Sequence, residues 1–229
     1  MDRREKMRVL RFWVLVAAVA CPSRAFSQDP HDYVPNLPYT AQLVGTGFET
    51  LADGTRVAYE DRLVRMRDSQ GRTRIEVCAS HDLNRGHDGC QPDVVNLYVP
   101  LRREFIQLFP GRKAASVGTW GPGPVPTHWQ TPGKTTTESL GGRLINGIYA
   151  EGTRTTRLIP SDSGHGPDIA YVFEDWVSPD LKLTVLHKDT STNTHPSNNE
   201  TTTEVRELRR TEPDASLFEI PVDYKIERQ

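Results

Sequence analysis

Apolar and polar residues alternate with a period of two along most of the chain beyond residue 40. The clearest example is the pair of segments 169–177 and 181–185, which Ser178-Pro179-Asp180 joins. Because successive side chains of a strand point to opposite faces, this alternation predicts strands. Two such segments joined by a turn predict an antiparallel hairpin.

A second group of strands is predicted before residue 78. Asp53-Gly54, a strong hairpin signal, separates residues 41–50 from residues 57–67, and a further turn leads into residues 72–77. The apolar positions change parity near residues 61–63, which predicts a β-bulge there. These three segments form a predicted meander.

The rest of the chain adds more extended segments. Strands are expected at residues 95–101, 137–159 and 204–210, and residues 105–109 and 113–117 are either strands or short helical turns. Residues 118–134 hold four prolines and four glycines and predict a loop, because proline is excluded from the interior of a sheet. About ten short strands thus predict a mainly β fold, a single curved antiparallel sheet with little helix.

Composition and charge narrow the function. Hydrophobic residues make up 36% of the chain, a low share that allows a modest core and suits a sheet with one face in water. Residues 1–27 carry six basic and two acidic side chains, a net +4, so a total of −2 leaves −6 on the remainder. That charge argues against general nucleic-acid binding, which needs a basic surface.

The first 27 residues resemble a secretory signal peptide. Basic residues precede the apolar run Phe12–Ala20, and Ala25-Phe26-Ser27 fits a cleavage site before Gln28. The run is too short to span a bilayer. The alternative is a lipid anchor at Cys21, after Ala18-Val19-Ala20. Both versions predict a periplasmic or secreted protein: residues 1–27 a signal peptide, 28–39 an extended arm with three prolines, and 40–226 a single β-rich domain.

Two cysteines remain after such cleavage. Cys78 and Cys90 flank a polar, turn-rich segment, and an even pair in an oxidising compartment predicts a disulfide. The alternative is a tetrahedral zinc site made of Cys78, His81, His87 and Cys90. The short five-residue centre between the histidines favours the disulfide.

No catalytic signature appears. The chain lacks G-x-S-x-G, H-E-x-x-H, paired C-x-x-C and P-loop motifs, and the histidines are scattered: His31, His81, His87, His128, His165, His187 and His195. Ser161, Asp162, Ser163 and His165 crowd one Gly/Pro loop without a scaffold. We therefore expect no enzyme and no cofactor.

Two residue groups have alternative interpretations. The arginines of the first meander are expected to form a solvent-exposed face paired with Glu60 and Glu76, or else an anionic-ligand site: Arg62, Arg65, Arg67, Arg72 and Arg74. Trp120 and Trp129 are expected to lie back over the sheet, or else to form a lid or an aromatic platform.

Six short motifs carry a family resemblance: residues 51–56 (LADGTR), 67–74 (RDSQGRTR), 138–141 (ESLG), 150–156 (AEGTRTT), 176–181 (WVSPDL) and 212–224 (EPDASLFEIPVDY). As a set they resemble an uncharacterised family of secreted acidobacterial proteins, over roughly residues 39–224. More remotely, the succession of strands is similar to the half-barrel of periplasmic lipoprotein carriers. That resemblance implies a half-barrel-like sheet whose concave face is apolar.

Two functional hypotheses follow. The first is an exported envelope protein, not membrane-spanning, that binds an apolar ligand, such as a lipid, or a lipidated partner on the concave sheet. The alternative is a structural or protein-interaction module of the envelope without a small-molecule ligand. A zinc protein or hydrolase would depend on the segment from Cys78 to Cys90 alone.

Overall fold

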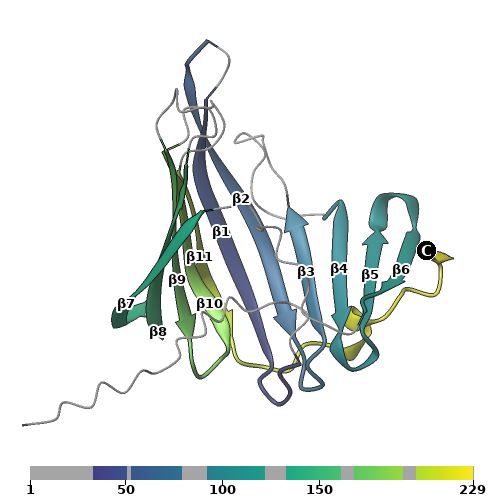
Figure 1. Cartoon of the computed structure of the whole chain (residues 1–229). Helices are drawn as coiled ribbons and strands as arrows, with labels where there is room; N and C mark the ends of the chain where they lie inside the picture. Colours follow the sequence, from purple (N-terminus) through teal and green to yellow (C-terminus); the bar gives the residue numbers. More distant parts are fainter. Residues whose placement is uncertain are drawn as a thin grey trace, which may run out of the picture.

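The computed structural model describes residues 33–50, 53–78, 92–121, 133–160, 168–192 and 200–228. They form one twelve-stranded sheet (Figure 1). The strands are β1 (Tyr39–Thr50), β2 (Arg56–Arg67), β3 (Thr73–Cys78), β4 (Val94–Val99), β5 (Glu104–Phe109), β6 (Ala114–Thr119), β7 (Lys134–Ile145), β8 (Ile148–Ile159), β9 (Ile169–Ser178), β10 (Leu183–Ser191), β11 (Glu200–Arg209) and β12 (Lys225–Arg228).

The strand order is β12-β6-β5-β4-β3-β2-β1-β11-β10-β9-β8-β7. Two meanders, β1 to β6 and β7 to β11, therefore join where β1 pairs with β11, and the open sheet curves between them (Figure 1). The predicted mainly β fold with a single curved sheet is confirmed. One departure is β12, which runs parallel to β6, so the sheet is mixed.

Helix is confined to three short 3₁₀ segments in the described part of the chain: η1 (Pro100–Arg102), η2 (Pro110–Arg112) and η3 (Ala215–Phe218). The segments that could have been strands or helical turns are strands β5 and β6. No helix among the described residues is long and apolar enough to cross a membrane.

The predicted bulge at residues 61–63 is wrong. β1 and β2 pair without a register shift from Tyr39 opposite Arg67 to Thr50 opposite Arg56. The apolar positions change parity because Val57, Tyr59 and Leu63 point to one face of β2, whereas Val64 and Met66 point to the other. Irregularities occur instead at Gln42/Leu43 against β11, at Ser139/Gly141 and at Thr184/Leu186.

The unbroken register from β1 to β6 divides the side chains of these strands between two faces. We name them the Leu43 face, which carries Tyr39, Ala41 and Leu43 of β1, and the Val44 face, which carries Thr40, Gln42 and Val44. Residues opposite one another across a ladder share a face, so each later strand can be assigned from its pairing.

The buried apolar residues form two clusters. The larger lies among β1 and β7 to β11 and the β9–β10 turn, and comprises Tyr39, Ala41, Ile145, Ile148, Ala150, Trp176, Leu181, Leu183, Val185, Leu186 and Val205. The smaller lies on the Val44 face of β4 to β6 and comprises Val95, Leu97, Ile106, Leu108 and Ala115. The sheet is therefore stabilised separately in its two halves.

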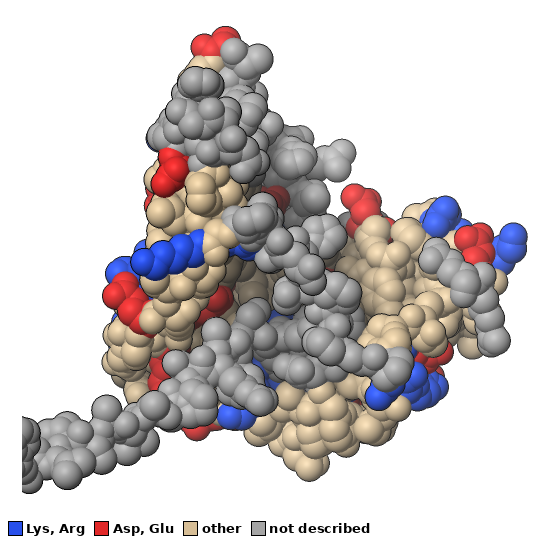
Figure 2. Space-filling model, viewed as in Figure 1, with Lys and Arg blue, Asp and Glu red and all other residues tan. Residues whose placement is uncertain are grey.

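Charged side chains outside these clusters pair along and across strands. Arg62 contacts Glu60 at 3.0 Å and Arg74 contacts Glu76 at 2.6 Å, so these two predicted pairings are confirmed. On the side of the molecule seen in Figure 2, acidic and basic residues are interspersed, and neither sign forms a continuous patch among the described residues.

The segment after β11 crosses the Val44 face and covers the smaller cluster. Ile220 and Tyr224 pack against it, Arg74 donates from Nη1 to the Leu217 carbonyl at 2.7 Å, and Phe218 is buried with the Arg72 guanidinium 5.0 Å from its ring centre. We call residues 211–224 the C-terminal strap.

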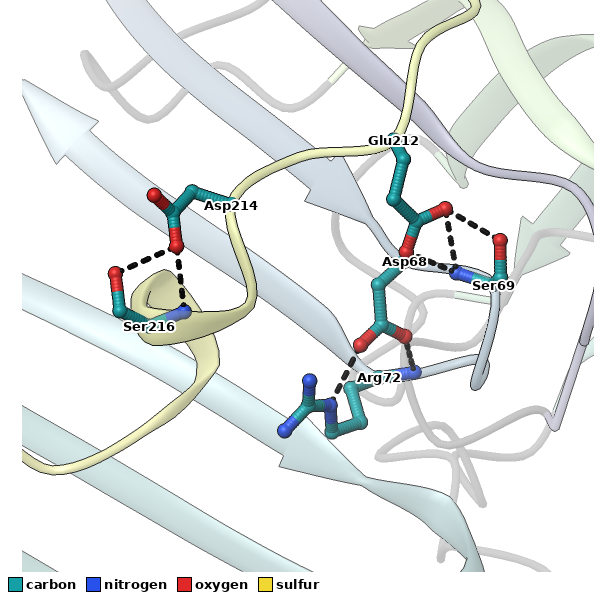
Figure 3. Close-up of polar contacts among 6 residues, drawn as sticks. All are labelled: Asp68, Ser69, Arg72, Glu212, Asp214 and Ser216. Atoms are coloured by element: carbon teal, nitrogen blue, oxygen red, sulfur yellow. Dashed lines mark hydrogen bonds and ion pairs between the residues drawn. The ribbon is translucent and has the colours of Figure 1, made fainter.

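The β2–β3 turn holds the strap by polar contacts (Figure 3). Asp68, itself buried, accepts from the backbone N and Nε of Arg72 at 2.8 and 2.6 Å. Glu212 of the strap accepts from the backbone N and the hydroxyl of Ser69, and Asp214 caps η3 by accepting from the Ser216 N at 2.9 Å. Two motifs of the family resemblance, residues 67–74 and 212–224, are therefore in contact.

Phe218 anchors the strap, and its loss is expected to be costly. Phe218→Ala leaves a cavity over β3 and should lower the free energy of unfolding by about 3 kcal/mol, measured by urea denaturation. Val222→Ala is the matched control, because Val222 is fully exposed and should change stability by less than about 0.5 kcal/mol. Equal effects of the two substitutions would contradict this packing.

Candidate functional site

Three rows of side chains cross the Leu43 face of β1 to β5. The lowest row, at the end of the face where β1 begins, is mainly aromatic and consists of Tyr39, Arg67, Thr73, Tyr98 and Phe105. The Tyr98 and Phe105 rings lie 5.1 Å apart, a favourable tilted contact. The row therefore carries aromatic rings at both of its ends, on β1 and on β4 and β5.

The middle row is polar. It consists of Ala41, Arg65, Ile75, Asn96 and Gln107. Gln107 donates from Nε2 to Oδ1 of Asn96 at 3.1 Å, so the two amides lie side by side. The row places hydrogen-bonding groups between two less polar rows.

The upper row is aliphatic: Leu43, Leu63, Val77 and Val94. All four side chains are half-buried. The 3₁₀ segment η3 packs on β3 and lies on the Val44 face with the strap. Leu43 packs against the larger apolar cluster at one end of the row, and all four side chains keep part of their surface exposed.

Residues 33–38 contact the lower end of this face. Asn36 donates its backbone N to the Ser69 carbonyl at 3.0 Å, and Arg67 donates from Nε to the Leu37 carbonyl at 2.9 Å. Gly71 has φ of +77° and lies so close to Tyr33 that a Cβ there would be 3.0 Å from the ring. A glycine is required at that position for both reasons.

Arg67 is the most unusual residue of the Leu43 face. Its side chain is fully buried, and the prediction that it lies on a solvent-exposed face with Arg62 and Arg74 is wrong. The alternation along β2 puts Arg65 and Arg67 on the face opposite to Arg62. The guanidinium lies 4.6 Å from the centre of the Tyr39 ring and donates to two carbonyls, those of Leu37 and Leu181.

The Arg67 charge is incompletely compensated. Its Nη1 is buried without a hydrogen-bond partner, and the hydroxyl of Tyr39 in the same cluster also has none. Burial, together with the positive charge of Arg65, holds the pKa of Arg67 below its ordinary value. No described carboxylate forms an ion pair with it, because Asp68 is turned to Arg72.

A second polar group lies on the same face in the other half of the sheet. His187 of β10 and Asp175 of β9 are paired through Nδ1 and Oδ1 at 2.8 Å, and Phe173 stacks on the imidazole. The hydrogen bond that His187 donates to Asp175 raises the pKa of His187 above its ordinary value, against the effect of burial. Asp189, whose pKa burial raises, is the other acidic neighbour.

The sequence did not reveal this pair because of a bulge. Ser178 pairs with Leu183 and Val177 with Thr184, a register that would place Leu186 opposite Asp175. The irregularity between Thr184 and Leu186 shifts the register by one, which brings His187 opposite Asp175. Alternation alone does not locate such a shift.

The residues predicted to bind metal or form a disulfide lie outside the described part of the structure. This applies to His81, His87 and Cys90 and to the side chain of Cys78, whose backbone pairs with Arg62. The signal segment with Cys21 and the loop residue Trp129 also fall outside it. Trp120 is half-buried and donates its backbone N to the Arg103 carbonyl. Among the described residues, no group of His, Cys, Asp and Glu could hold a metal ion.

No family model matches the chain, and no curated protein matches it. Among solved structures, MucB in complex with MucA(peri) is similar with a TM-score of 0.43 and 12% identity, over 82% of this chain and 55% of that chain. The chain thus spans little more than half of that protein.

A LolA superfamily protein from Nitrosomonas europaea is similar with a TM-score of 0.37 and 5% identity, over 83% of this chain and 93% of that chain. Both likenesses are too weak to bear on what this chain binds. Membership of the acidobacterial family stays a prediction.

The His187–Asp175 pair should make stability depend on pH. Because the folded-state pKa of His187 is raised above 6.5, the pair stabilises the fold below that pH, and its contribution is lost as the pH rises through the folded-state pKa. His187→Gln should therefore lower the free energy of unfolding at pH 5.5 by about 0.5 kcal/mol more than at pH 8.5, a small effect because the pair is partly exposed.

Urea denaturation at the two pH values measures this difference. Lys188→Gln is the control, since Lys188 is the next residue on β10 and points to the other face. It should shift stability equally at both pH values. A pH-independent effect of His187→Gln would contradict the pairing.

Proposed function

We propose that the chain is an exported envelope protein that holds an apolar ligand, or the acyl chain of a lipidated partner, against the Leu43 face. The protein performs no chemical step in this proposal. The expected signal peptide would deliver it to the periplasm or the exterior, where lipids and lipidated proteins need shielding from water during transfer.

The single observation that carries the proposal is the aliphatic row formed by Leu43, Leu63, Val77 and Val94. Four strands spaced about 4.8 Å apart make this row roughly 15 Å long. Partly exposed apolar side chains in a contiguous row are typical of binding surfaces. On the Val44 face, the strap covers the apolar cluster of β4 to β6, and ion pairs lie on β2 and β3.

One observation favours a second function, recognition of a protein through the edge of the sheet. β7 is twelve residues long, ends the sheet, and exposes almost every side chain, including Leu144 at 70%. Unpaired edge strands accept extended peptides by strand addition. Recovery of a stoichiometric protein partner that Thr137→Pro abolishes would support this function.

The uncharged fluorescent probe N-phenyl-1-naphthylamine tests the first function. The purified mature protein should bind it with an increase in fluorescence. Leu63→Asn, in the aliphatic row, should weaken binding about tenfold or more, because burial of a leucine side chain contributes roughly 1.5–3 kcal/mol.

Val64→Asn is the matched control, since Val64 is adjacent on β2 and points to the Val44 face. It should leave the affinity for the probe within about twofold of the unmodified protein. Absence of probe binding to the unmodified protein, or equal loss in both variants, would reject the apolar-ligand function.

A further inference from the structure

Arg67 is a buried cation for which the described chain supplies no anion. Its exposed fraction is 0%, and the guanidinium contacts two carbonyl oxygens and the face of the Tyr39 ring. Carbonyl dipoles and an aromatic ring compensate a charge only in part, and a buried ion is costly unless an opposite charge pairs with it. An arginine retained at this depth therefore needs a further explanation.

The guanidinium of Arg67 also has an unsatisfied hydrogen-bond donor. Nη1 of Arg67 is buried and donates to nothing, and the hydroxyl of Tyr39, whose ring lies under the guanidinium, is also unpaired. A buried donor without an acceptor is destabilising, and more so when it is charged. Two such groups at one end of the Leu43 face leave hydrogen bonds available to an acceptor supplied from outside the chain.

The position of Arg67 relates it to the aliphatic row. Arg67, Arg65 and Leu63 follow one another on the same face of β2, so Arg67 lies about 14 Å from Leu63 at about 3.4 Å per residue. A molecule with a charged end and an extended apolar chain would span that distance along the strand. Arg65 adds a second positive charge on the way.

We infer that the ligand of the Leu43 face is an anionic amphiphile, in which a carboxylate or a phosphate pairs with Arg67 while its apolar chain lies on the aliphatic row. This inference rests on the proposed function and specifies its ligand class. Since Arg67 is fully buried and bonded to the carbonyls of both Leu37 and Leu181, entry of the anion requires a shift of the β9–β10 turn or of residues 35–38 at the lower end of the face. Residues 35–38 are held there by the Asn36 backbone and the Leu37 carbonyl.

Displacement of N-phenyl-1-naphthylamine by three molecules with the same chain tests the inference: laurate, dodecyl phosphate and uncharged dodecanol. A charge-assisted hydrogen bond contributes about 1.5–3 kcal/mol. At least one anion should therefore displace the probe at a concentration about tenfold or more below that of dodecanol. The two anions distinguish a carboxylate-bearing ligand from a phosphate-bearing one.

Arg67→Met should abolish the preference for the anion while dodecanol still displaces the probe. Arg62→Met, on the opposite face of β2, should retain the preference. In unmodified protein the preference should persist in 1 M sodium chloride, because screening weakens surface contacts far more than buried ones. This measurement decides the matter if Arg67→Met does not fold.

The outcomes separate the two proposals. If the probe binds but dodecanol and both anions displace it equally, or if the preference disappears at high salt, the inference is overturned and the proposed function stands. The same holds if Arg67→Met folds and keeps the preference, since Arg67 is then a structural charge only. If the probe does not bind the unmodified protein, the proposed function fails, and this inference with it.

Discussion

An unbroken antiparallel register from β1 to β6 determines what each side of this half of the sheet can do. The ladders from the Tyr39–Arg67 pair of β1 and β2 to the Phe105–Gly118 pair of β5 and β6 contain no inserted residue. Every second side chain therefore points to the same face across all six strands. One face then collects the small buried cluster around Leu97, and the other collects an aromatic, a polar and an aliphatic row. A single inserted residue in β2 would exchange Leu63 with Val64 and destroy both surfaces.

The same register explains why Arg67 is buried while Arg62 and Arg74 are not. Odd-numbered residues at the end of β2 face Tyr39, whereas even-numbered ones face the strap or water. The turn that follows is fixed by Asp68 and Arg72 and leaves Ser69 exposed to Glu212. One five-residue turn thus holds both the segment before β1 and the strap after β11, which are distant in sequence.

Much of the fold was predictable because alternation is a local property. The hairpin of β9 and β10, the Asp53-Gly54 turn, and the pairing of arginines with Glu60 and Glu76 could all be inferred from neighbouring residues. The features that escaped depend on long-range geometry. The parallel addition of β12 to β6 has no local signal, and neither has the irregularity between Thr184 and Leu186.

The candidate site was less predictable than the fold for the same reason. The arginine-rich strand was noticed, but whether Arg67 lies in water or in the interior depends on the carbonyls of Leu37 and Leu181, which the fold brings together from 30 and 114 positions away. The partner of His187 depends on a bulge whose position the apolar pattern does not mark.

The covering of the smaller cluster by residues 211–224 has a consequence for biogenesis. The contact between Ser69 and Glu212 joins positions 143 residues apart, so the strands β4 to β6 are made long before the segment that shields them. During vectorial synthesis or translocation, Val95, Leu97 and Ile106 stay open to solvent until almost the whole polypeptide has emerged. Apolar surface exposed in that interval favours aggregation, and contacts between distant positions form slowly.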